Sequence, residues 1–401
     1  MKGKITAILK GLLLSLLVGV CGGGMGRLFS AAIALVTGLR LQNGWLICLL
    51  PVAGLLSVWL YRRLRVDTVG TNQVIASTCE NEGVSPLLAP AVFVASTLSH
   101  LCGASVGREG AALQLGGGVA TAIGRLFRVD KERQKLLVYC GMAGVFSGVF
   151  GTPLAAVAFT LEVAWVGHMR GRAVIPTLLS SLSAYGILRL LGGEPERFPL
   201  TLPSFSVPLL GKLALIAALS ALVAMAFCRL LHLAEHGAAH LFKNAYLRIA
   251  VGGALLIALT ALVGNQTYNG AGTDVIHRVF AEGEIGYEAF LLKLLFTCVA
   301  VGVGYKGGEI VPTLFIGATF GGAAAALLGI SPALGAAVGL TALFCGATNC
   351  LLASALLAAE LFSGVGIGYT TLAAVIAFFL SGRVSLYTAQ RRDRLREIYH
   401  K

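Results

Sequence analysis

One short segment of the chain combines a carboxylate, a cation and glycine: Gly107-Arg108-Glu109-Gly110. Apolar, helix-compatible residues follow Gly110, which predicts that Glu109 lies in the first turn of a helix. Free backbone N–H groups and the positive end of the helix dipole stabilise negative charge at that place. An anion would bind there whenever the carboxylate moves away. The segment therefore predicts a gate, in which Glu109 competes with an anion for one pocket and is released when it takes up a proton.

Two other interpretations of Glu109 use the same residues. The glutamate could simply cap its helix and pair with Arg108, and the sequence leaves that alternative open. It could also act with a histidine in a membrane-embedded enzyme. Against an enzyme, no nucleophile stands beside a base, and the nine cysteines occur singly, without the spacing of a metal site. We therefore expect a transporter rather than an enzyme, with no cofactor and no metal ion.

The composition of the chain indicates that these residues lie within a lipid bilayer. Of the 401 residues, 57% are hydrophobic and only 12% are charged, and the mean hydropathy is +0.84. Soluble proteins carry about 25% charged residues, so lipid must cover most of this surface. Apolar segments recur at residues 5–20, 45–61, 87–102, 136–150, 209–233, 249–263, 289–303 and 372–380. A carboxylate within a bilayer costs about 2.5–3.5 kcal/mol, which favours a functional role for Glu109.

The basic residues lie between the apolar segments and at the two ends of the chain. The net charge is +13, but this distribution does not indicate binding to nucleic acid. Lys2, Lys4 and Lys10 precede the first apolar segment, and a basic stretch at residues 390–396 follows the last. The positive-inside rule then places both termini in the cytoplasm, with an even number of crossings of the cell (inner) membrane. Residues 1–25 also resemble a signal peptide, although a first spanning helix is the simpler assignment.

Short, interrupted apolar segments occur at corresponding places in the two halves of the chain. Residues 107–117 align with residues 308–318, and a glutamate follows each at a similar distance, Glu162 in the first half and Glu360 in the second. Paired broken helices of this kind are typical of the substrate site of a transporter. We expect Glu162 and Glu360 to have structural roles, such as capping a helix or bridging to a basic residue.

The alignment predicts two related repeats, residues 1–195 and 196–401, in inverted orientation. The most polar internal stretch, residues 192–208, would be the loop that joins them. We predict a single transmembrane domain, with no soluble domain appended and a short basic cytoplasmic tail.

The second glycine-rich segment also contains charged residues, Lys306 and Glu309, which could tune the electrostatic field near an anion. Backbone N–H groups at both predicted helix starts could complete the shell of an anion without side chains. These groups belong to Gly110, Ala111, Ile310 and Val311.

In these segments the chain resembles the CLC family of anion channels and anion/proton antiporters. Residues 107–110 match its GREG signature, with Ala111 in place of the usual proline. Residues 150–155 followed by Glu162 resemble its FNxPLAG…xE element, and residues 307–312 resemble its second anion-binding loop. Ser385-Leu386-Tyr387 resembles the segment that carries its anion-coordinating tyrosine. The resemblance spans nearly the whole chain.

The resemblance implies an all-α membrane protein with a CLC-like fold, in which tilted and broken half-helices of two inverted repeats meet at a midplane anion site. It further implies a homodimer in which each subunit has its own anion path. Glu109 would be the external gating glutamate, and Gly107 and Arg108 would contribute to the anion site beside it.

The chain departs from the common family pattern at several positions, and the residues at these positions resemble those of its fluoride-exporting branch. The first loop is Gly70-Thr71-Asn72 rather than GSGIP, Val163 stands where most chloride/proton antiporters have a second glutamate, and the later loop contains KGGE. The resemblance thus implies fluoride/proton antiport that exports fluoride. A chloride/proton antiporter remains an alternative, because Thr71 and Ala355 differ from the residues usual in the fluoride branch. A passive chloride or fluoride channel also remains one, because Val163 leaves no obvious internal proton relay.

Thr71 and Tyr387 are the side chains expected to contact the halide. The threonine hydroxyl can donate a hydrogen bond to an anion, and its alternative role is to cap the helix that begins near Asn72. The phenolic O–H of Tyr387 can donate to the same anion from the cytoplasmic side. Its alternative role is that of an interfacial aromatic residue beside the basic tail.

Overall fold

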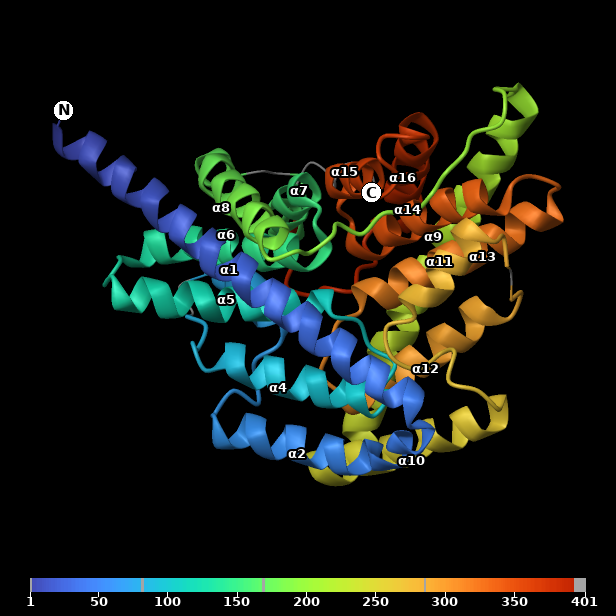
Figure 1. Ribbon diagram of the computed structural model, residues 1–401, viewed down its shortest axis with the longest axis horizontal. Helices are drawn as coiled ribbons and strands as arrows, with labels where there is room; N and C mark the ends of the chain where they lie inside the picture. Colours follow the sequence, from blue (N-terminus) through green and yellow to red (C-terminus); the bar gives the residue numbers. More distant parts are fainter. Residues whose placement is uncertain (1, 81–82, 168–169, 285, 393–401) are drawn as a thin grey trace.

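The computed structural model describes residues 2–80, 83–167, 170–284 and 286–392, which form sixteen α-helices (Figure 1). The first eight are α1 (Lys2–Gln42), α2 (Leu50–Arg63), α3 (Thr71–Ser77), α4 (Leu88–Leu101), α5 (Glu109–Leu126), α6 (Lys131–Phe150), α7 (Pro153–Ala164) and α8 (Gly171–Leu190). The next eight are α9 (Val207–Leu241), α10 (Ala245–Val263), α11 (Thr273–Ala281), α12 (Ala289–Val303), α13 (Ile310–Leu327), α14 (Pro332–Thr348), α15 (Leu351–Leu361) and α16 (Ile367–Ser381). A 3-10 helix, η1 (Gly44–Leu49), precedes α2, and β1 (Trp165–Val166) pairs in parallel with β2 (Arg391–Arg392).

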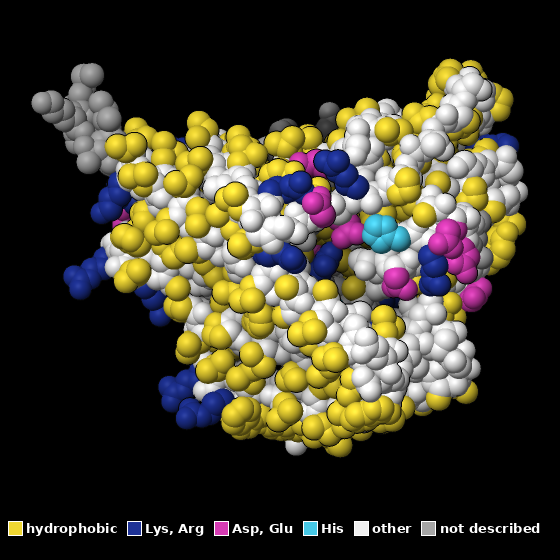
Figure 2. Space-filling model, viewed as in Figure 1, with side chains coloured by type: hydrophobic (Ala, Val, Ile, Leu, Met, Phe, Trp, Pro, Cys, Tyr) yellow, Lys and Arg dark blue, Asp and Glu magenta, His cyan; other side chains and the backbone are white. Residues whose placement is uncertain are grey.

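Within the described residues, six helical segments are long and apolar enough to cross a membrane. They are α1 from Ile8, η1 with α2, α8, α9, α10 and α13. Six further apolar helices are shorter, as the interrupted sequence predicts. Apolar side chains cover much of the face shown in Figure 2, whereas charged side chains gather near its middle and along one edge. These features define a multi-pass membrane protein.

The first helix is longer than the apolar segment that predicted it, because its glycines do not end it. The segment was expected at residues 5–20, whereas α1 continues to Gln42. A Cβ at Gly23 would lie 2.6 Å from the carbonyl oxygen of Ala184, and one at Gly26 would lie 2.8 Å from the carbonyl carbon of Gly148. Glycine therefore lets α1 pack closely on α6 and α8. This packing makes the glycine-rich part of α1 a component of the fold.

The order of helices α9–α16 repeats that of α1–α8. In each half the first helix is long, and the third and seventh helices are short. These short helices are α3 and α7 in the first half, and α11 and α15 in the second. The short helices α7 and α15 also contact each other. This helix order is compatible with the two repeats that the sequence alignment predicts.

Glu162 and Glu360 bind each repeat to the other in the same way. The carboxylate of Glu162, in α7, accepts hydrogen bonds from the amides of Leu352 (3.1 Å) and Ala353 (2.8 Å) at the start of α15. The carboxylate of Glu360, in α15, accepts from the amides of Leu154 (3.0 Å) and Ala155 (2.9 Å) at the start of α7. Each glutamate therefore caps the helix of the other repeat, which confirms their predicted structural role.

Candidate anion site

Glu109 is the first residue of α5, and its side chain is fully buried. Its Oε2 atom accepts a hydrogen bond from the backbone N–H of Arg108 (3.0 Å), and its Oε1 atom accepts from Nε of the same arginine (3.1 Å). The predicted position of Glu109 at a helix start is confirmed. The pairing with Arg108 that the capping alternative required is present as well, so the role of Glu109 as a gate rests on what surrounds it.

The starts of α5 and α13 lie against each other through a short antiparallel backbone pair. The amide of Gly107 donates to the carbonyl of Gly308 (2.6 Å), and the amide of Gly308 donates to the carbonyl of Gly107 (2.7 Å). A Cβ at Gly308 would lie 2.3 Å from the amide nitrogen of Gly110. Only glycine allows this approach, which brings together the two glycine-rich segments of the sequence.

The amides at these two helix starts differ in whether they are free. Gly110 and Ala111 in α5, and Ile310 and Val311 in α13, lie in the first helical turn, where N–H groups have no intrahelical acceptor. The amide of Gly107 is occupied by the backbone pair, and that of Arg108 by the Glu109 carboxylate. The carboxylate thus occupies an amide at the start of α5.

Tyr387 and Thr71 line one cavity of about 440 Å³. Gln114, Lys306 and Glu309 line it as well. Among the described residues, the Tyr387 hydroxyl, Gln114 Oε1 and Glu309 Oε2 are buried and have no hydrogen-bond partner. Three unpaired polar atoms in one cavity indicate a place where a polar ligand completes the bonding.

Thr71 is the first residue of α3, and it does not cap that helix. The N-cap residue is Gly70, so the capping alternative is wrong at this position. Instead, Thr71 Oγ1 accepts a hydrogen bond from Gln114 Nε2 (3.0 Å), which leaves the hydroxyl proton free to donate elsewhere. Gln114 was missed as a site residue, because nothing in its local sequence indicates which helix α5 would face.

Tyr387 is held in the interior, which excludes the interfacial alternative. Its side chain is 3% exposed, its ring packs against Phe159 with centroids 6.4 Å apart, and its amide donates to Ser385 Oγ (3.1 Å). The basic stretch expected at residues 390–396 lies outside the described residues after residue 392.

Charged side chains surround the open part of the same cavity. Lys306 Nζ lies 4.5 Å from the centre of the Tyr61 ring, and Glu309 Oε2 lies 2.9 Å from the position of a Cβ at Gly110. Glu235 and Arg248 also line the cavity, and no motif in the sequence predicted either residue. Lys306 and Glu309 therefore both line the cavity that Thr71 and Tyr387 line.

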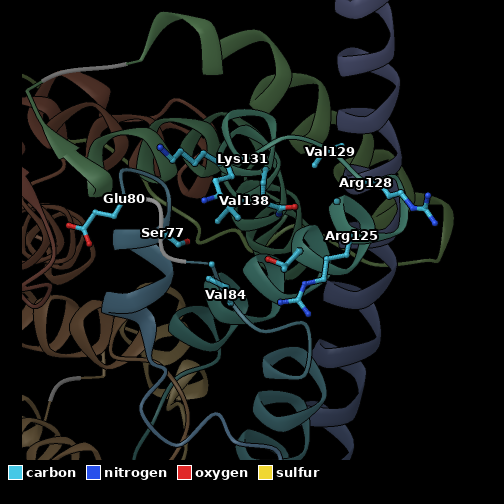
Figure 3. Close-up of a pocket in the computed structure, with 13 residues that line it drawn as sticks. Ser77, Glu80, Val84, Arg125, Arg128, Val129, Lys131 and Val138 are labelled. Carbon is cyan, nitrogen blue, oxygen red and sulfur yellow. The ribbon is translucent and has the colours of Figure 1, made fainter.

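A second cavity, of about 490 Å³, has a basic lining but a different geometry (Figure 3). Arg125, Arg128 and Lys131 contribute to it, together with Glu80. Figure 3 shows the side chains of these three basic residues pointing away from one another. They do not converge on one point in this view, in contrast to the unpaired polar atoms that share the first cavity.

The histidines and cysteines contribute no metal site within the ranges that the structure describes. His100 is buried, with Nδ1 2.8 Å from the carbonyl oxygen of Ser96, as expected of a packing residue. The sequence shows no histidine cluster, which predicts packing or interface roles for these residues, and His168 lies outside the described residues.

A helical membrane protein with a buried carboxylate at the meeting point of two broken helices is built to pass an anion. The family model for voltage gated chloride channels matches residues 53–382. The chain therefore belongs to this family, the CLC family, whose members are membrane transporters and channels for anions rather than enzymes.

Individual relatives are similar over nearly the full chain. A chloride/fluoride channel protein of Pseudomonas syringae pv. tomato is 33% identical, over 96% of this chain and 87% of the relative. An H(+)/Cl(−) exchange transporter of Vibrio cholerae is 28% identical, over 94% and 88%. Among solved structures, a CLC-type fluoride/proton antiporter superposes with a TM-score of 0.93 at 31% identity, over 96% of this chain and 98% of that one. The CLC-like fold predicted from the sequence is confirmed.

Proposed function

We propose that the protein exchanges fluoride for protons and exports fluoride, with Glu109 as the proton-linked gate. The observation that supports this most is the position of the Glu109 carboxylate. It is fully buried, lies at the start of α5 where that helix meets the start of α13, and occupies the amide of Arg108. An anion and this carboxylate cannot both use that amide, and protonation removes the charge that holds Glu109 there.

The anion would be bound by donors from both repeats. The hydroxyls of Thr71 and Tyr387 supply two of them, and the amides of Gly110, Ala111, Ile310 and Val311 supply the rest. Gly107 fixes the two helix starts together, and Arg108 gains a free amide when Glu109 leaves. Lys306 and Glu309 set the field in the cavity from its open side.

Fluoride is favoured as the transported ion for two reasons. Two of the similar proteins are described by their activity toward fluoride: one is a chloride/fluoride channel protein, and the other is the CLC-type fluoride/proton antiporter among the solved structures. In addition, this chain has Val163 at the position after Glu162, so no second glutamate is available for a separate proton path there. The proton would then be carried by Glu109 itself.

The orientation and assembly follow from the same proposal. Both termini would face the cytoplasm of the cell (inner) membrane, the repeats would be residues 1–195 and 196–401, and two copies would form a homodimer. Tyr387 precedes the basic residues Arg391 and Arg392, so the open side of the cavity would face inward.

Efflux from proteoliposomes tests the function. Liposomes loaded with fluoride or with chloride are measured in parallel with fluoride- and chloride-selective electrodes, together with a pH indicator in the lumen. We expect rapid fluoride efflux, slower chloride efflux and uptake of protons driven by the fluoride gradient. Fluoride flux without proton movement would mean a passive channel, and faster chloride than fluoride would mean a chloride transporter.

A further inference from the structure

Four charged or titratable side chains form a continuous chain from the gate to the surface. Arg108 joins two carboxylates: its Nε lies 3.1 Å from Glu109 Oε1, and its Nη2 lies 3.0 Å from Glu196 Oε2. The other oxygen of Glu196 lies 2.8 Å from His277 Nε2. The Glu109 side chain is 0% exposed, whereas that of His277 is 47% exposed. The chain thus connects a buried carboxylate to an imidazole in contact with water.

Glu196 is fixed in place by the backbone around it. It belongs to the segment between α8 and α9, which crosses the front of the molecule in Figure 1. Its amide donates to the carbonyl of Phe150 at the end of α6 (2.9 Å), and the amide of Phe198 donates to the carbonyl of Leu361 at the end of α15 (2.9 Å). A segment that the sequence suggested only as a polar loop is therefore anchored to both repeats.

His277 is fixed as well, and its surroundings are simple. Its ring packs on Phe198, with centroids 4.8 Å apart. The charged groups that face it are Glu196 and, on its own helix, Asp274, which pairs with Arg278 at 3.7 Å. The neighbouring helices α13 and α14 carry no charged residue. The charge on His277 therefore acts mainly on Glu196.

The bond between His277 and Glu196 favours the charged form of both groups. Hydrogen bonding to Glu196 raises the pKa of His277 above its ordinary value of 6.5 despite partial burial. Burial opposes ionisation of Glu196, but His277 and Arg108 outweigh it and hold the pKa of this carboxyl below its usual value. Glu196 is thus favoured in its ionised form, and His277, an imidazole in contact with water, is the group of this pair whose proton can exchange.

We propose that Glu196 is a positioning residue for the gate, and that the protonation of His277 sets how strongly Glu196 draws the charge of Arg108 away from Glu109. This inference rests on the proposed gating role of Glu109. An ionised Glu196 shares the Arg108 cation and so weakens its hold on the Glu109 carboxylate. When His277 is protonated, its positive charge pairs with the Glu196 carboxylate. Arg108 then pairs more strongly with the Glu109 carboxylate. Mild acid therefore stabilises the closed, ionised gate, and stronger acid is needed to release it.

The test compares substitutions that alter this chain in opposite directions. Fluoride efflux is measured from liposomes that contain the full-length protein, with equal pH on both sides, to find the pH of half-maximal flux. Glu196→Gln leaves Arg108 to Glu109 alone, so we expect an acid shift of about one pH unit. His277→Gln keeps Glu196 fully available to Arg108, so we expect a smaller alkaline shift of about 0.3 of a unit. Opposite signs are not expected from two substitutions that merely loosen the same contact.

Matched controls separate this inference from the proposed function. Glu194→Gln changes a glutamate in the same segment that pairs with Arg189 instead, and it should leave the profile unchanged. The double variant should behave as Glu196→Gln alone, and Glu196→Asp should restore part of the profile. In a Glu109→Gln background both shifts should vanish.

Two results would overturn the inference. They are unchanged profiles in both single variants, and shifts of the same sign. If Glu196→Gln does not fold, the shift of His277→Gln alone tests the inference. The His277 side chain is half-exposed, so its replacement leaves no cavity in the core. A wild-type protein that moves fluoride without protons would contradict the proposed function, yet the shifts would still report how Glu109 is held.

Discussion

The starts of α5 and α13 occupy equivalent places in the two repeats, but they hold their carboxylates differently. Glu109 has both oxygens bonded, because Arg108 precedes it and supplies an amide and a guanidinium. Glu309 precedes α13 after Gly308, and its Oε2 atom has no partner in the described structure. Arg108 thus holds Glu109 at the start of α5, and no equivalent cation bonds Glu309 at the start of α13 in the described structure. The two helix starts therefore differ at the place where the ion would pass.

The pair formed by Glu162 and Glu360 gives a third case. Each of these carboxylates accepts hydrogen bonds from two amides of the opposite half, and among the described residues neither forms an ion pair with a cation. Their equal geometry indicates a fixed structural bond, whereas Glu109 is held by a group that Glu196 also binds. A carboxylate with a shared partner is the easier one to release.

The largest expected effect comes from removing the proton site of the gate. Glu109→Gln keeps the size of the side chain but cannot exchange a proton, so we expect fluoride-driven proton uptake to be abolished while fluoride flux persists. The measurement is luminal pH in fluoride-loaded proteoliposomes. A variant that still pumps protons against their gradient would rule out Glu109 as the carrier.

A large effect on stability is expected where the two repeats cap each other. Glu162→Gln replaces one accepting oxygen with an NH₂ group, which faces the amide of Leu352 or Ala353 and cannot accept from it. We expect a loss of about 2–4 kcal/mol in the free energy of unfolding. Glu360→Gln is the matched variant and should cost a similar amount. Thermal unfolding in detergent measures both, and a strong difference between the two would contradict their equivalence.

The sequence predicted much of this architecture because the features concerned are local. A carboxylate between glycines, followed by apolar residues, determines a helix start at Glu109 from neighbouring residues alone, and repeated motifs then align α5 with α13. Other features depend on contacts between distant segments. Gln114 meets Thr71, and Glu196 meets Arg108, only because the helices pack as they do. No local pattern encodes those pairs, so the sequence alone gave no sign of either.

A moderate effect is expected where side-chain hydroxyls meet the anion. Tyr387→Phe removes a buried O–H without changing the ring that packs on Phe159. The loss of one donor to an ion is worth about 1.4 kcal/mol, so the fluoride concentration for half-maximal flux should rise about tenfold. Thr71→Ala should act in the same direction, while Thr71→Ser should retain wild-type behaviour. Unchanged concentration dependence in both Tyr387→Phe and Thr71→Ala would place the anion elsewhere.

The smallest effects should come from Lys306 and Glu309, and their signs matter more than their sizes. Both residues line the cavity, so their charges act on the anion at a distance rather than through a bond, and water in the cavity screens them. Lys306→Met removes an attraction and should raise the half-maximal fluoride concentration about threefold, which corresponds to roughly 0.7 kcal/mol. Glu309→Gln removes a repulsion and should lower it by a similar factor. A loss of affinity in both variants would mean that Glu309 touches the ion as a protonated donor, and then both helix starts would take part in the proton cycle.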